Sequence, residues 1–137
     1  MEPYCDRDSR QKHYNSKFGF TCSCTCCSLE SEESSASDTR RTRIGELDDI
    51  IYNHIRNGKY EEGLAGVAER LELLAVEGLD TPAMICRVAY DAYQACQHSD
   101  DSEGAKKWIK MVYEHQKLSD HCESDDLVEL GKVIASL

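Results

Sequence analysis

The sequence predicts a mainly α-helical protein, in which a helical bundle is preceded by a small cysteine-rich loop. Two observations lead to this prediction. From residue 39 to the end of the 137-residue chain, apolar residues recur three and four positions apart, which is the spacing of one face of an α-helix. Before that region, four of the eight cysteines fall within the stretch "TCSCTCC", residues 21–27.

Composition divides the chain into three parts. Residues 1–27 are locally basic and end in the cysteine cluster. Residues 28–38, "SLESEESSASD", are acidic and serine-rich, so we expect a flexible linker that buries too little apolar surface to order itself. Residues 39–137 form the predicted helical domain.

The first predicted helix runs from about Asp38, as its N-cap, to Arg56, and Asn57-Gly58 ends it. The second runs from about Lys59 to Glu77 and is closed by Gly78. The helical faces that predict them are Ile44, Leu47, Ile50, Ile51, His54 and Ile55 in the first, and Tyr60, Leu64, Val67, Leu71 and Leu74 in the second.

Three further helices follow. Thr81-Pro82 opens the third, with a hydroxyl at the N-cap and proline in the first turn. The fourth starts near Asp101, and a shorter fifth covers about 124–136. Their predicted buried residues include Ile85, Val88, Ala89, Ala92, Tyr93 and Cys96, then Ala105, Trp108, Ile109, Val112 and Tyr113, then Leu127, Leu130, Val133 and Ile134.

A weak internal repeat relates two of the helical segments. "KYEEGLAGVAERLELLAVEG" and "DDSEGAKKWIKMVYEHQKLS" align when offset by about 40 residues, close to the period of tetratricopeptide-like helix pairs. Such pairs bury their apolar faces by stacking on neighbours, and the stack leaves a groove. The sequence therefore predicts a tetratricopeptide-like bundle that binds a protein or peptide partner.

Charge and hydropathy exclude several function classes. A formal net charge of −10 argues against nucleic acid as a partner, because phosphate binding needs a basic surface. No apolar run is long enough to span a bilayer, and "MEPYCDRDSRQ" lacks the pattern of a signal peptide. We therefore expect a nuclear or cytoplasmic protein, with no membrane partner, in a reducing compartment that disfavours disulfides.

The cysteine cluster has the spacing C-x-C-x-x-C in Cys22, Cys24 and Cys27, which lets a tight loop point three sulfurs at one zinc ion. Cys26 is adjacent to Cys27, and neighbours on an extended loop face opposite ways. The fourth ligand stays open between Cys26, Cys5, His13 and a group outside this chain. A metal-free cysteine-rich tail and redox chemistry are the alternatives; Cys86 and Cys96, on helical faces, are predicted to be buried small hydrophobes.

The order of these features resembles the C-terminal part of SET-domain proteins of the SET-and-MYND type, particularly their fungal relatives. The matching stretches are "DRDSRQKHYNSKFGF", "TCSCTCC" and "RIGELDDIIYNHIRNGKYEEGL". In that family a SET domain is followed by a post-SET cysteine loop and then by tetratricopeptide-like helices. The resemblance implies that Cys22, Cys24 and Cys27 are post-SET ligands of a structural zinc, with the fourth ligand in the SET domain. It also implies that Phe18 and Phe20 pack beside the S-adenosylmethionine cofactor and the lysine channel.

This chain departs from the family in one large respect. It contains no N-H-x-x-x-P-N-like cofactor segment and no G-E-E-[IL] stretch, so no SET core is present and no catalytic residue is assigned. The resemblance then implies a C-terminal fragment of a protein-lysine methyltransferase-like protein, inactive alone and binding S-adenosylmethionine only if a SET core is supplied. The alternative is a stand-alone tetratricopeptide-like interaction module. Its acidic stretch would attract a basic, histone-like segment through Asp120, Glu123, Asp125, Asp126 and Glu129.

Overall fold

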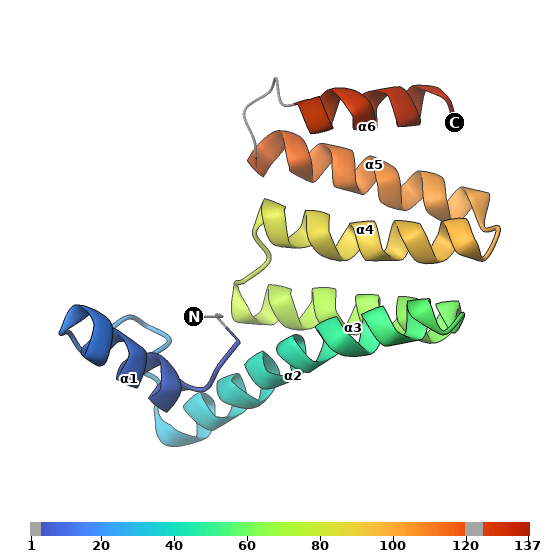
Figure 1. Ribbon diagram of the computed structural model, residues 1–137. Helices are drawn as coiled ribbons and strands as arrows, with labels where there is room; N and C mark the ends of the chain where they lie inside the picture. The colour runs from blue at the N-terminus through green and yellow to red at the C-terminus, as the bar shows by residue number, and fades with distance from the viewer. Residues whose placement is uncertain (1–3, 120–124) are drawn as a thin grey trace. The chain divides into compact units, whose positions relative to one another are not determined.

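The computed structural model describes residues 4–119 and 125–137, and these residues form six helices and no strand (Figure 1). The prediction of a mainly α-helical chain is confirmed. The chain divides into two compact units, Met1–Asp48 and Asp49–Leu137, and the boundary lies inside a helix. Within the described residues, no helix combines the length and the apolarity that crossing a membrane requires.

The first unit contains helix α1, Arg7–Phe18, which the sequence analysis did not predict. This helix is almost entirely polar, so it has no apolar stripe to reveal it. Its ends are fixed by local hydrogen bonds instead. The Asp6 carboxylate accepts a bond from the Ser9 N–H at 2.7 Å, and Gly19 adopts the left-handed conformation that closes the last turn.

Helix α2, Ser31–Arg56, begins seven residues earlier than predicted. Residues 31–38 are therefore helical, and the predictions of a flexible linker there and of an N-cap at Asp38 are wrong. Glu32 and Glu33 lie in the first turn, where carboxylates are favoured by the positive end of the helix dipole. Ser34 and Ser37 are buried, so this polar stretch has tertiary contacts that its composition does not reveal.

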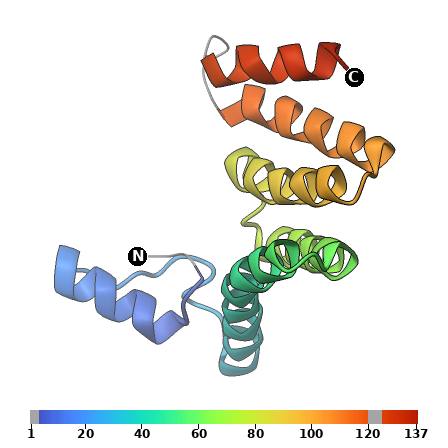
Figure 2. The same ribbon diagram turned by 45° about the vertical axis from the view of Figure 1, so that its right-hand side comes forward.

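The second unit contains the last turns of α2 and four further helices: α3 (Tyr60–Glu77), α4 (Pro82–His98), α5 (Ser102–Ser119) and α6 (Asp125–Ala135). Helices α3 to α6 stack in chain order, and both ribbon views show this order (Figures 1 and 2). All four predicted helices of this region are present, and each bound that was predicted for them lies within two residues of the observed one.

Turn chemistry ends these helices as the sequence predicts. Gly58 and Gly78 both have positive φ, which glycine adopts without a steric penalty. Thr81 is the N-cap of α4, its hydroxyl accepting a bond from the Met84 N–H at 3.3 Å, and Pro82 is the first helical residue.

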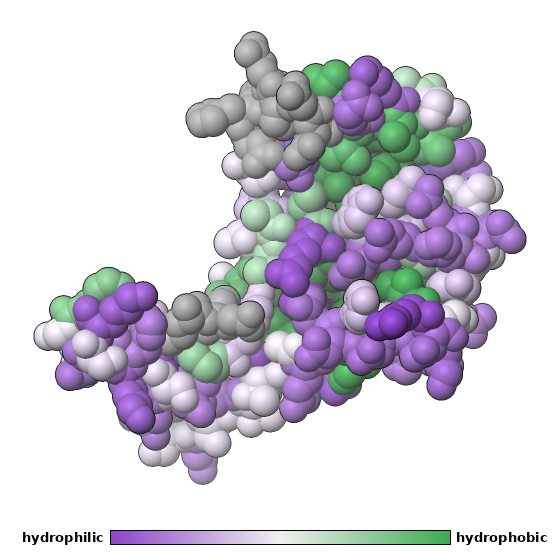
Figure 3. Space-filling model, viewed as in Figure 1, coloured by the Kyte–Doolittle hydropathy of each residue, from purple (hydrophilic) through white to green (hydrophobic). Residues whose placement is uncertain are grey.

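The core of the second unit lies between α4 and α5, which share the most extensive helix contact. The predicted burial of Cys86 and Cys96 is confirmed, since both belong to this core. Leu130 and Ile134 of α6 pack against the same core from the other side of α5. Hydrophobic residues also reach the surface over α5 and α6 (Figure 3). The buried core residues are Cys86, Ala89, Tyr93, Cys96, Ala105, Ile109 and Val112.

The close approach of α4 and α5 predicts that Gly104→Ala destabilises the protein. An added Cβ would overlap the Asp101 carboxylate and lie 2.8 Å from the buried Cys96 sulfur. We expect the free energy of unfolding to fall by about 1–3 kcal/mol, the usual cost of overpacking, measured by chemical denaturation followed by circular dichroism. The control is Gly131→Ala, whose Cβ would meet nothing nearer than Tyr113 at 3.7 Å. A fall of equal size in both variants would contradict the packing argument.

Candidate metal centre

Three cysteines converge in the loop between α1 and α2. The Sγ atoms of Cys22, Cys24 and Cys27 all lie within 4.8 Å of one another. Three thiolates at ~2.3 Å from one tetrahedral ion would be about 3.8 Å apart, so small shifts would bring all three to a common metal. The predicted ligand set is therefore brought together, and it is able to hold a metal ion.

Helix α1 fixes the first of these cysteines. The Gln11 side chain donates to the Cys22 carbonyl oxygen at 2.7 Å and accepts from the Cys22 N–H at 2.8 Å. This reciprocal pair of hydrogen bonds holds the Cys22 backbone against α1, at the start of the cysteine loop. Because Gln11 lies in the middle of α1, the helix that the sequence analysis missed is what positions the start of the cluster.

The loop then folds back so that Cys24 and Cys27 meet. The Cys27 N–H donates to the Cys24 sulfur at 3.4 Å, and the Ser28 N–H donates to the Cys24 carbonyl oxygen at 2.9 Å. The hydrogen bond from the Cys27 N–H, helped by the Cys22 thiol, lowers the pKa of Cys24 to about 7. Burial raises the pKa of Cys27 to about 11 in the metal-free loop, and the neighbouring thiols of Cys24 and Cys22 add to the rise.

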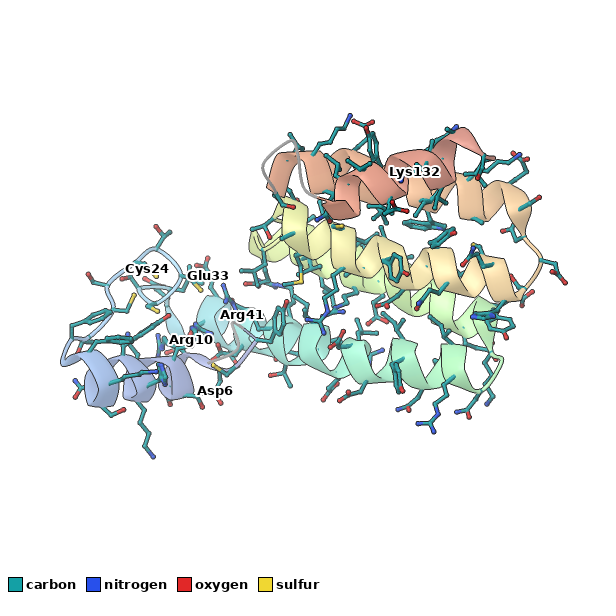
Figure 4. The ribbon with its side chains drawn as sticks, turned by 45° about the horizontal axis from the view of Figure 1, so that its top comes forward. Asp6, Arg10, Cys24, Glu33, Arg41 and Lys132 are labelled. Carbon is teal, nitrogen blue, oxygen red and sulfur yellow. The ribbon has the colours of Figure 1, made fainter. Side chains whose placement is uncertain are left out.

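Cys26 faces away from the cluster, as the sequence predicts. Its sulfur accepts bonds from the Arg41 guanidinium at 3.3 Å and from the Arg10 guanidinium at 3.7 Å, and it lies 4.0 Å from the Ser37 hydroxyl. Figure 4 shows Arg10 and Arg41 between α1 and α2, with Cys24 on the outer loop. Cys26 therefore anchors the back of the loop to α2 and does not belong to the group of converging sulfurs.

Arg10 connects Cys26 to two other segments. It is 5% exposed, donates to the Cys5 carbonyl oxygen at 2.5 Å and lies 3.6 Å from the Asp38 carboxylate. Burial lowers the pKa of Arg10, but Cys26, Cys27 and Asp38 outweigh it and raise the pKa overall, so the charged form is favoured. Neither Arg10 nor Arg41 was recognised from the sequence, because nothing in the spacing of basic residues marks them as partners of a sulfur.

The described residues supply three converging sulfurs and no fourth member of the group. Of the in-chain candidates, Cys26 is turned toward the arginines, and neither Cys5 nor His13 joins the group. The His13 ring instead packs edge-on against Tyr14 and Phe18, each at 6.1 Å between centroids. A fourth ligand from water or from outside these residues is needed to complete a tetrahedron.

An exposed aromatic cluster stands beside the loop. Phe18 is 61% and Phe20 47% exposed, and the Phe20 ring stacks on Tyr14 at 5.3 Å between centroids. Phe18 lies 6.4 Å from Phe20. Both phenylalanines named in the sequence analysis are therefore neighbours on one surface, but the structure gives no contact that identifies S-adenosylmethionine as their ligand.

The acidic stretch expected to attract a basic partner falls largely outside the described residues. Asp120 and Glu123 lie there entirely, and only the helical backbone of Asp125 and Asp126 is described. Glu129 is described, and its carboxylate pairs with Lys132 at 2.6 Å. This pairing reduces the attraction that Glu129 offers to a basic segment.

No family model, curated protein or solved structure matches this chain. The resemblance to SET-and-MYND proteins therefore stays a prediction.

The two thiol pKa values predict a pH-dependent difference in reactivity in the metal-free protein. The thiolate is the nucleophile, so we expect alkylation of Cys24 by iodoacetamide to reach half its maximum near pH 7, its pKa being about 7. Cys27, with a pKa of about 11, stays largely unmodified over the same range. Peptide mass spectrometry measures both, and urea-unfolded protein is the control. Equal rates at Cys24 and Cys27 in the folded protein would contradict the loop geometry.

The orientation of the cysteines predicts that only three of the four matter for metal binding. We expect Cys22→Ser, Cys24→Ser and Cys27→Ser each to weaken Co²⁺ binding by about tenfold or more, since each removes a thiolate ligand. The matched control is Cys26→Ser, which leaves the affinity within about threefold. Thiolate-to-metal charge-transfer absorbance reports the binding. If Cys26→Ser weakened Co²⁺ binding as much as the other three substitutions do, Cys26 would be a ligand.

Proposed function

We propose that this chain is the C-terminal portion of a SET-domain protein-lysine methyltransferase-like protein, which supplies a structural zinc loop and a helical domain and is inactive alone. The observation that carries the proposal is the convergence of Cys22, Cys24 and Cys27 within 4.8 Å, directly after the Phe18–Phe20 aromatic pair. This is the arrangement that the post-SET resemblance implies for those residues.

The donor set supports zinc as the metal. Three cysteine sulfurs on a tight loop suit a soft, tetrahedral ion, and zinc is the usual ion of such structural sites. A three-sulfur site also suits a loop whose last ligand comes from a separate part of a larger protein. Bound there, zinc would hold the loop in shape; the chain's own contribution is to position the sulfurs through Gln11, Arg10 and Arg41.

The aromatic cluster fits the same proposal. A loop that closes over a cofactor and a lysine channel needs an apolar surface free to meet the other wall, and Phe18 and Phe20 offer one. In this proposal S-adenosylmethionine binds only when a SET core is present, and no residue of this chain is catalytic. The helical unit serves as a protein-interaction module, which is also the alternative function if no SET core belongs to the chain.

Measurements of zinc affinity and of cofactor binding test the proposal. They compare two proteins: this chain alone, and this chain with the upstream residues that its longest transcript encodes. We expect the extension to contain a SET core and to tighten zinc binding by about tenfold or more, because a fourth ligand completes the tetrahedron. We expect isothermal titration to detect S-adenosylmethionine binding to the extended protein and none to the chain alone.

Three outcomes would contradict parts of this proposal. Micromolar S-adenosylmethionine binding to the chain alone would show that no SET core is needed. An upstream reading frame closed in every transcript would remove the methyltransferase assignment and leave the interaction module. Unchanged zinc affinity in an extended, folded protein would show that the fourth ligand is not in the SET core.

A further inference from the structure

A cavity of about 300 Å³ opens at one end of the helical unit. It lies where the end of α4 meets the start of α5, and the last residue of the chain borders it. Figure 1 shows the α4–α5 turn and the C-terminus on the same side of this unit. The residues on which the argument rests are Tyr93, Gln97, Asp100, Asp101, Ala105 and Leu137.

The interior of this cavity is largely apolar. Tyr93 and Ala105 are both buried, and Leu137, which is half-exposed, forms a side of the opening. The Tyr93 hydroxyl is held by the Gln97 amide, whose Nε2 donates to it at 2.5 Å. This bond fixes the Tyr93 ring as a rigid wall of the cavity.

The opening of the cavity is acidic. Asp100 is exposed and has φ of 59°, so its place at the rim is set by a left-handed turn. Asp101 caps α5, its carboxylate accepting from the Gly104 N–H at 2.9 Å. Burial raises the pKa of Cys96 on the cavity wall, and Asp101 raises it further, whereas Lys107 opposes the rise.

Two lysines in the first turns of α5 have other partners. The Lys107 ammonium lies 5.5 Å from the centre of the Trp108 ring, and Lys106 pairs with Glu103 at 3.2 Å. Neither lysine is among the residues that border the cavity. Among the described residues that border the cavity, the charged side chains are therefore those of Asp100 and Asp101.

We propose that this cavity binds a lysine side chain from a basic peptide segment of a partner protein. The methylene stem would lie against Tyr93, Ala105 and Leu137, and the ammonium would stay at the rim beside Asp100 and Asp101. A volume of about 300 Å³ is at the small end of ligand pockets, which suits one side chain and not a whole cofactor. The proposal does not depend on the zinc loop or on a SET core.

Nuclear magnetic resonance titration of the full chain tests it. The probe is a capped hexapeptide with two lysines, and the matched peptide carries norleucine, which keeps the stem and removes the charge. We expect the lysine peptide to shift the amide signals of Gln97, Asp100, Ser102 and Ala105, and the norleucine peptide to bind at least about fivefold more weakly. Raising the salt from about 50 to about 300 mM weakens the lysine peptide further.

Asp100→Asn is the decisive variant, because asparagine adopts the left-handed conformation as readily as aspartate and the turn is kept. We expect it to weaken the lysine peptide about fivefold. Glu72→Gln, an exposed site on α3, removes the same charge elsewhere and leaves affinity unchanged. Equal weakening by both variants, equal binding of both peptides, or shifts confined to other helices would overturn the proposal.

Discussion

In the cysteine-bearing unit, the buried guanidinium of Arg10 connects three segments. Arg10 joins the segment before α1, through the Cys5 carbonyl, to the loop at Cys26 and to α2 at Asp38. A buried charge is tolerated only when its partners surround it, and removing one partner of such a set leaves the others uncompensated. With three segments tied to a single group, the loop that presents the sulfurs gains a fixed base.

The helical unit could be predicted from the sequence because its rules are local. Thr81-Pro82, Gly58 and Gly78 mark helix ends through their own backbone chemistry, and the apolar stripes mark the faces. The helices of the first unit could not be predicted in this way. Its helix α1 is almost entirely polar, and the start of α2 is rich in serine and glutamate, a composition that predicts a flexible linker when burial is unknown.

The candidate site likewise has a part that could be predicted from the sequence and a part that could not. The C-x-C-x-x-C spacing of Cys22, Cys24 and Cys27 sufficed to predict that they meet, because a tight loop with this spacing can point three sulfurs at one ion. The side chains that position these cysteines lie outside the cysteine motif. Gln11 is eleven residues from Cys22 and Arg41 fifteen from Cys26, and neither amide nor guanidinium carries a sequence signal for contact with a cysteine. Such partners become visible only when the tertiary structure is known.

The reciprocal bond between Gln11 and Cys22 has a consequence for the durability of the loop. A carboxamide carries no charge, so this tie is indifferent to acidity and to ionic strength, unlike the Arg10–Asp38 pair. It is vulnerable instead to ageing. Deamidation would turn the donor nitrogen into a second acceptor oxygen facing the Cys22 carbonyl, so slow chemical damage at one neutral side chain would release the first sulfur of the cluster.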